Sequence, residues 1–265
     1  ETPNYDVEKW HGRKLKIEQA KDLSGIDEVK YVESFHDWLN RAVIESKVER
    51  VFLDLEKQSW DADDSHAMEF AKTFMSKYVH VQVKSLQKIV TDLRVIKSDV
   101  EIELIRKAIS FTKMGLENVV QGLKPGMYEY QAEALFDFGI FFNGAHENAF
   151  PTIAASGPDG VILHYVDNNK LIPDDALILM DLGAGYMNYA SDITRTYPVS
   201  GKYTDRQKTF YNMVLKAQSE TIKMMKPGIH FSKLNETCKN VLIEECKKIG
   251  LIDKDEDISQ YYYHG

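Results

Sequence analysis

The first part of the chain alternates helical and strand patterns of apolar residues. An amphipathic run extends from Ile26 to Ile44, and the short apolar segment VFLDL follows at 51–55. A second helical run, from Ala67 to Lys77, precedes the alternating segment VHVQV at 79–83. Apolar residues at every third or fourth position are typical of helices, and short alternating runs are typical of strands. The order predicts a small α/β domain with a β-α-β unit.

A helical pattern resumes in SLQKIVTDLRVIKSDVEIELIRKAI at 85–109, but its spacing breaks near Lys97 and Ser98. Ser98 precedes Glu101 by three positions, and this pair is the signature of a capping box that begins a new helix. We therefore expect the domain boundary near this break.

The second domain contains an internal repeat. LKPGMYEY at 123–130 and MKPGIHFS at 225–232 are 102 residues apart (225 − 123), and an amphipathic run follows each. The Pro-Gly pair stops a helix, so each copy predicts two helices joined by a tight turn. Two related halves are implied, each a helix pair and then a sheet. The first half has strand patterns near 149–154, 161–165, 176–183 and 190–198. The second half would need its strands after Gly265.

Two aspartates lie on either side of a predicted hairpin at 176–199. Gly185 and Asn188 bracket its tip, and both residue types tolerate the positive φ of such turns. The midpoint of Asp181 and Asp192 is 186.5, so a symmetric hairpin places them directly opposite each other. Like charges in that position are destabilising unless they share a proton or face cations. Paired carboxylates suit hard divalent ions, which makes Asp181 and Asp192 candidate metal ligands.

This segment has two other interpretations. Most aspartates are solvated surface groups, but Asp181 directly follows the apolar run ALILM and so leaves a buried strand. ILMDLGAG also resembles the glycine loop of a nucleotide-binding or methyltransferase fold. Such a loop opens a helix, whereas ASDITRTYPV alternates and is rich in β-branched residues, so the nucleotide loop is rejected.

Composition excludes several classes of partner. The 265 residues carry a formal net charge of −8 and a pI near 5.5, which gives no electrostatic signal for nucleic acid. The apolar stretches are too short to span a bilayer and no leader pattern opens the chain, so we expect a cytoplasmic protein without membrane partners. Cys238 and Cys246 fit neither a redox pair nor a zinc knuckle and are expected to be reduced. No HExxH motif is present, which excludes a thermolysin-like zinc site.

Three segments resemble one enzyme family in order and spacing. They are SGPDGVILHYVDNN at 156–169, ALILMDLGAGYMNYASDITRTYPVSGKYTDRQKTFYNMVL at 176–215, and the terminal YYYHG. They are similar to the pita-bread metallopeptidases, most of all to the Xaa-Pro aminopeptidase (aminopeptidase P) branch, with prolidases next. The resemblance implies an α/β (α+β) fold. Residues 1–85 would be the carboxy-terminal part of the family's amino-terminal domain, and residues 86–265 the first part of its pseudo-two-fold catalytic domain.

The resemblance also implies roles for four residues. Asp181 and Asp192 match the family's two aspartate metal ligands, the second of which bridges both ions. His164 matches a catalytic, substrate-contacting histidine, and His264 matches a further substrate-binding histidine. The remaining His and Glu ligands of the family would lie beyond Gly265. Because the chain opens without Met and stops within a motif, we expect it to be a fragment.

The implied activity is hydrolysis of the bond between an amino-terminal residue and proline. By resemblance, a hydroxide bridging two divalent ions, Mn²⁺ in the family, attacks the scissile carbonyl, and the partners are peptides with proline at the second position. A homo-oligomer is compatible with this assignment. Two alternatives stay open: a prolidase restricted to Xaa-Pro dipeptides, and a non-catalytic peptidase-like binding module, which the retained aspartates disfavour.

Overall fold

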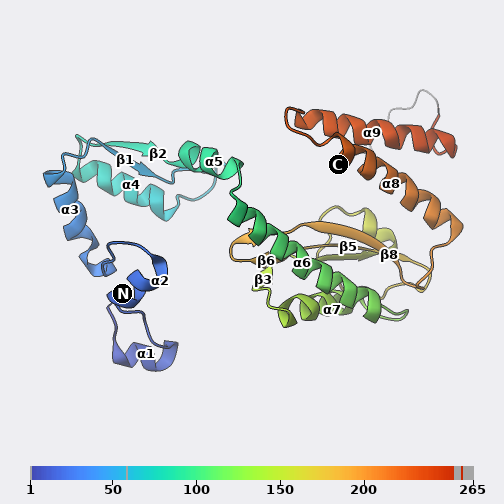
Figure 1. Cartoon of the computed structure of the whole chain (residues 1–265), viewed down its shortest axis with the longest axis horizontal. Coiled ribbons are helices and arrows are strands. Elements are labelled where there is room, and N and C mark those ends of the chain that lie inside the picture. The colour runs from blue at the N-terminus through green and yellow to red at the C-terminus, as the bar shows by residue number, and fades with distance from the viewer. Residues whose placement is uncertain (1, 58, 254–257, 259–265) are drawn as a thin grey trace. The chain divides into compact units, whose positions relative to one another are not determined.

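The chain divides into two units, residues 1–97 and residues 98–265. The computed structural model describes residues 2–57, 59–253 and 258. In the described part of the chain, no helix has the length and apolar character needed to cross a membrane. The two units are shown in Figure 1.

The first unit is built around a parallel β-α-β motif, as the sequence pattern predicts. Strands β1 and β2 pair in parallel and are joined by helix α4, whose inner face buries Phe74 against Val43 and Val81. The helix predicted to begin near Ile26 begins only at Phe35, after a single 3₁₀ turn, because Tyr31 has an extended backbone. The elements of this unit are α1 (Tyr5–His11), α2 (Ile17–Ser24), η1 (Val32–Ser34), α3 (Phe35–Glu45), β1 (Arg50–Leu53), α4 (His66–Lys77), β2 (Gln82–Ser85) and α5 (Gln87–Val95).

The second unit begins with a capped helix, α6 (Asp99–Gly122). The Ser98 backbone N–H donates to Glu101 Oε2 at 2.6 Å, and the Glu101 N–H donates to Ser98 Oγ at 3.4 Å. These reciprocal bonds satisfy two donors that a helix start leaves without partners, so the predicted capping box is confirmed.

The predicted repeat is present as two helix pairs. Helix α6 is followed by α7 (Glu129–Phe142), and α8 (Asp205–Met224) is followed by α9 (Phe231–Lys248). Gly126 and Gly228 occupy the same place in the two connecting turns, 102 residues apart (228 − 126), with φ of 81° and 89°. The same left-handed backbone at the same offset confirms that the two Pro-Gly segments are structurally equivalent. The free thiols of Cys238 and Cys246 lie half-buried on α9.

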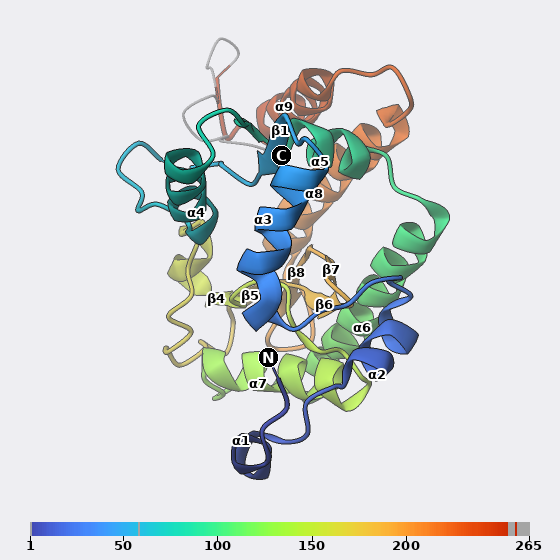
Figure 2. The same cartoon turned by 90° about the vertical axis from the view of Figure 1, so that its left-hand side faces the viewer.

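Two small antiparallel sheets lie against α6 and α7. Their strand orders are β4-β5-β8 and β3-β6-β7. The core between helices and strands contains Phe111 and Val119 of α6, Phe136 of α7, and Ile178 and Met180 of β5. Figure 2 shows α6 and α7 in green beside the strands. The strands are β3 (Glu147–Asn148), β4 (Ile153–Ser156), β5 (Leu177–Leu182), β6 (Ala184–Tyr186), β7 (Tyr189–Ala190) and β8 (Ile193–Pro198).

One predicted strand, at 161–165, is wrong. The segment lies in a loop that follows the 3₁₀ helix η2 (Gly157–Val161). Val161, Ile162 and Leu163 are 85%, 51% and 58% exposed. Their β-branched and apolar character gives the local pattern of a strand, but a strand also needs a partner, and Tyr165 is instead anchored by its hydroxyl to Glu129. The predicted strands near 149–154, 176–183 and 190–198 correspond to β4, β5 and β8, with shifted ends.

Candidate metal and substrate site

Asp181 is the penultimate residue of the buried strand β5, and one of its carboxylate oxygens has no hydrogen-bond partner. Met180 and Leu182, its neighbours on either side, are fully buried in the core, while Asp181 is half-buried on the opposite face. Its Oδ1 is inaccessible to water and is the only carboxylate oxygen among the described residues that is buried without a hydrogen-bond partner. A buried acceptor without a partner costs free energy unless a proton or a cation compensates it.

Asp192 lies just before β8, and its carboxyl group is beside that of Asp181. Burial of the group raises the pKa of Asp192, and the charge of Asp181 and a hydrogen bond between the two carboxyls raise it further. The predicted direct pairing is nevertheless wrong. Asp181 pairs with Thr194, so Asp192 is its diagonal neighbour on the same face, two residues along the strand.

The turn at the tip of the hairpin explains the shifted register. Tyr186 pairs with Tyr189, which leaves Met187 and Asn188 as a two-residue turn with φ of 51° and 64°. Positive φ at both central residues is the type I′ geometry that matches the twist of two strands. The hairpin is therefore centred between Met187 and Asn188, one residue later than predicted, and this moves every cross-strand pair by two residues.

The two arms of the hairpin approach each other closely between the two aspartates, at Gly183 and Ser191. A Cβ atom on Gly183 would lie 1.8 Å from the carbonyl oxygen of Ser191. Only glycine fits where two strands come this close. The hairpin also passes from one sheet to the other here, because Leu182 belongs to β5 and Ala184 to β6.

A buried threonine of α6 forms hydrogen bonds with both arms of the hairpin at this crossing. The Ala184 N–H donates to Thr112 Oγ1 at 2.8 Å, and the Thr112 and Ser191 hydroxyls share a hydrogen bond of 2.6 Å. Thr112 is 0% exposed and Ser191 is 5% exposed. Neither residue is predictable from the sequence, because a threonine within a helix and a serine next to an aspartate have no distinctive local pattern. Thr112 thus fixes the segments that carry Asp181 and Asp192.

The structure describes one of the two candidate histidines. His164 is exposed in the loop after η2, next to the buried Tyr165, and not in a strand at 161–165 as predicted. His264 lies outside the described residues. In the described ranges, no three His, Cys, Asp or Glu side chains come together as a metal site, so Asp181 and Asp192 are a pair of carboxylates and His164 does not join them in such a cluster.

The pair fits part of a divalent-cation site. It offers only oxygen ligands, one of them buried and unpaired, and the mutual repulsion of the carboxylates would be relieved by a positive charge. Two carboxylates alone do not complete the coordination of even one such ion, since hard cations take six or more oxygen ligands. Asp181 and Asp192 would therefore hold one side of the site.

Known proteins resemble the chain across almost its whole length. It is 30% identical to the Xaa-Pro aminopeptidase of Haemophilus influenzae over 98% of this chain and 60% of that protein. It is 29% identical to the Xaa-Pro dipeptidase of Rattus norvegicus over 94% of this chain and 51% of that protein. The chain thus spans about half to three fifths of the length of these relatives.

Solved structures show the same fold. A Bacillus anthracis protein assigned to aminopeptidase P is 42% identical and superposes with a TM-score of 0.95, covering 100% of this chain and 63% of that one. The low-pH form of Escherichia coli aminopeptidase P, 26% identical, gives a TM-score of 0.86 over 96% and 58% of the two chains. The mixed α/β fold expected from the resemblance is confirmed. The sequence model of metallopeptidase family M24 matches residues 103–265, more than half of the chain, and the chain therefore belongs to that family.

Proposed function

We propose that the intact protein is an Xaa-Pro aminopeptidase that hydrolyses the peptide bond between an amino-terminal residue and proline. The observation that carries the proposal is the pair of neighbouring carboxylates, Asp181 and Asp192, with the buried, unpaired Oδ1 of Asp181. Members of family M24 generally bind divalent metal ions. The relatives named for Xaa-Pro hydrolysis support the substrate class.

Asp181 and Asp192 would hold the ions, Mn²⁺ by resemblance. When bound, divalent ions of this kind acidify a water molecule and polarise a carbonyl group. The chain's own contribution is rigid placement: Asp181 is fixed by pairing with Ile153 of β4 and Thr194 of β8, and Asp192 follows Ser191, which Thr112 holds. Rigid ligands favour one coordination geometry and reduce the reorganisation that reaction would otherwise require.

His164 would act on the substrate rather than on the metal. Its imidazole is exposed, and a neutral imidazole can donate or accept a hydrogen bond at the scissile carbonyl. The apolar residues that precede it, Ile162 and Leu163, are also exposed and could contact the side chains of a peptide. His164→Ala should therefore lower kcat and leave metal binding nearly unchanged. Loss of bound metal in this variant would show that the role is misassigned.

A prolidase is the second candidate, because a rat Xaa-Pro dipeptidase is similar over 94% of this chain. The two functions differ in substrate length. The test compares hydrolysis of an Xaa-Pro dipeptide with that of an Xaa-Pro-Xaa tripeptide by the intact, Mn²⁺-loaded protein. Cleavage of the tripeptide after its first residue supports the aminopeptidase, and cleavage of the dipeptide alone supports the prolidase. Binding of Xaa-Pro peptides without hydrolysis of either would favour the non-catalytic module.

A further inference from the structure

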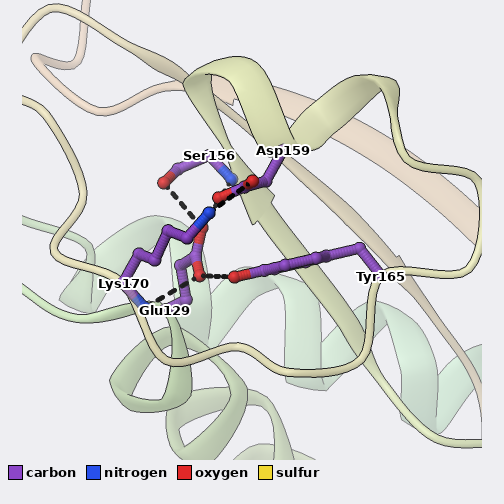
Figure 3. A network of polar contacts seen from close by, with 5 residues as sticks. All are labelled: Glu129, Ser156, Asp159, Tyr165 and Lys170. Atoms are coloured by element: carbon purple, nitrogen blue, oxygen red, sulfur yellow. Dashed lines mark hydrogen bonds and ion pairs between the residues drawn. The ribbon is translucent and has the colours of Figure 1, made fainter.

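A buried glutamate at the start of α7 anchors the loop that carries His164. Glu129 is 0% exposed, and its carboxylate accepts four hydrogen bonds. Oε1 accepts from the backbone N–H and the hydroxyl of Ser156, at 2.8 and 2.7 Å. Oε2 accepts from the Tyr165 hydroxyl at 2.7 Å and from the Lys170 N–H at 3.1 Å. Figure 3 shows the donors converging on the two oxygens.

All four donors belong to one segment, residues 156–170. Ser156 is its first residue, Tyr165 is near its middle and Lys170 is its last, so a single side chain bonds the loop at both ends and in between. A carboxylate removed from water is unfavourable unless such donors surround it, and hydrogen bonds to a charged acceptor are stronger than neutral ones. The arrangement therefore stabilises one path of the loop.

Burial of apolar side chains contributes little to the conformation of this loop. Val161, Ile162 and Leu163 are mostly exposed, so they contribute little burial. The polar contacts around Glu129 provide the order instead. Lys170 Nζ lies 2.7 Å from Oδ1 of the buried Asp159, which ties η2 to the same end of the loop. The pKa of Tyr165 is raised to about 12, by burial first and then by the bond to Glu129, so its hydroxyl stays a donor across the neutral range.

We propose that Glu129 is a positioning residue, which holds Tyr165 and thereby sets the place of the adjacent His164 imidazole. This inference rests on the proposed function of His164. His164 is the direct neighbour of Tyr165 in the chain, and Tyr165 is buried while His164 is exposed. A displacement of the Tyr165 hydroxyl therefore displaces the His164 backbone. The sequence gives no hint of this role, because a glutamate at the first position of a helix is usually a solvated group that complements the helix dipole.

The test uses Glu129→Gln in the intact protein. An amide keeps the size of the side chain but replaces one acceptor oxygen with an NH₂ donor, so two of the four donors lose their acceptor whichever way the amide lies. We expect kcat for an Xaa-Pro tripeptide to fall by about tenfold or more, since small misplacements of a catalytic group have effects of that size. Bound Mn²⁺ should be unchanged, because Asp181 and Asp192 are not altered. The matched control is Glu117→Gln, at an exposed position on α6 where the carboxylate lies 3.6 Å from Lys113 Nζ.

A double-mutant cycle separates positioning from general destabilisation. If Glu129 acts through His164, Glu129→Gln should lower kcat by less than about twofold in a His164→Ala background, because the group that it positions is already gone. Equal fold losses in both backgrounds, or wild-type turnover of Glu129→Gln, would overturn the proposal. Should Glu129→Gln fail to fold, Tyr165→Phe removes only one of the four donors and carries the same cycle.

A second measurement distinguishes failure of this inference from failure of the proposed function. Amide hydrogen exchange in residues 157–165 should be faster in Glu129→Gln than in the wild type, with exchange in β5 unchanged. If the wild type hydrolyses no Xaa-Pro peptide, the proposed function fails, and exchange alone decides whether Glu129 orders the loop. Unchanged exchange in 157–165 contradicts the anchoring role in either case.

Discussion

The hydroxyl oxygens of Thr112 and Ser191 lie 2.6 Å apart, although 79 residues separate them in the chain. Both also contact the backbone N–H of Ala184, at 2.8 and 3.2 Å. Together these hydrogen bonds join α6 to both arms of the hairpin, at the point between Asp181 and Asp192. Because both hydroxyls are buried, neither can exchange its partner for water without opening the core.

Thr112→Val should weaken both the fold and the metal site. Valine keeps the shape of threonine but leaves the Ala184 N–H and the Ser191 hydroxyl with poorer partners. We expect the free energy of unfolding to fall by about 1–3 kcal/mol. The Kd for Mn²⁺ should rise roughly tenfold or more, as it does when groups that orient metal ligands are removed. Denaturant titration and calorimetric metal titration measure the two effects.

Thr221→Val is the matched control for that variant. Thr221 is also a helical threonine. Its hydroxyl donates to the carbonyl of Ala217, four residues earlier, as the Thr112 hydroxyl does to that of Ala108. It lies on α8 and bonds neither arm of the hairpin. An equal loss of Mn²⁺ affinity in Thr221→Val and Thr112→Val would contradict the positioning role of Thr112.

Gly183→Ala should disrupt the hairpin between the aspartates. The added methyl group would lie 1.8 Å from the Ser191 carbonyl oxygen, so the two arms must separate. We expect the unfolding free energy to fall by about 3 kcal/mol, the upper range for overpacking. Gly160→Ala is the control, since its nearest neighbour would be the Ala155 carbonyl oxygen at 3.8 Å, an ordinary contact. Similar thermal midpoints for the two variants would show that the backbone at Gly183 accommodates a side chain.

The sequence predicted those features whose causes are local. The capping box of Ser98 and Glu101 and the turns at Gly126 and Gly228 depend on residues within one turn of chain, and all are present. The proximity of Asp181 and Asp192 was predictable for the same reason, because a buried strand followed by a turn has a recognisable pattern. The hairpin is centred one residue later than predicted, because Met187 adopts a positive φ that its residue type disfavours.

Features that depend on long-range contacts were not predictable from patterns of neighbouring residues. The donors on Glu129 come from 27 to 41 residues away. The loop at 161–165 was assigned to a strand because its residues favour extended structure, and only the anchoring of Tyr165 shows otherwise. The metal-ligand roles of Asp181 and Asp192, the substrate roles of His164 and His264, and the domain bounds 1–85 and 86–265 stay predictions.

Asp192→Asn should show separately how the carboxylate pair affects the stability of the fold and how it affects metal binding. Asparagine keeps the shape but removes the charge that repels Asp181. Without metal, we expect the fold to be unchanged or more stable by about 0.5 kcal/mol, because like charges on neighbouring strands are destabilising. With Mn²⁺, affinity and Xaa-Pro hydrolysis should both fall sharply. The measurements are thermal unfolding with and without chelator, calorimetric titration and a peptide assay.

The exposed Asp174→Asn serves as control for that variant, because it removes one charge from the same unit away from the pair. Wild-type Mn²⁺ affinity and turnover in Asp192→Asn would show that this carboxylate is not a ligand. A loss of stability in the absence of metal would show that the two aspartates do not repel each other in the folded protein.

The raised pKa of Tyr165 predicts how the unfolding free energy changes in alkaline solution. Its pKa is raised from 10.0 to about 12, by burial and then by the Glu129 carboxylate, so the folded protein keeps the phenolic proton where the unfolded chain releases it. The stabilisation from this group is complete below pH 10 and is lost as the pH rises toward 12. The unfolding free energy, measured by urea titration from pH 9 to about 11.5, should fall less steeply in Tyr165→Phe than in the wild type, since the variant has no proton to lose there. Tyr130→Phe, at an exposed position on the same helix as Glu129, should keep the wild-type slope. Equal slopes for Tyr165→Phe and the wild type would show that burial and the Glu129 carboxylate do not raise the pKa of Tyr165 in solution.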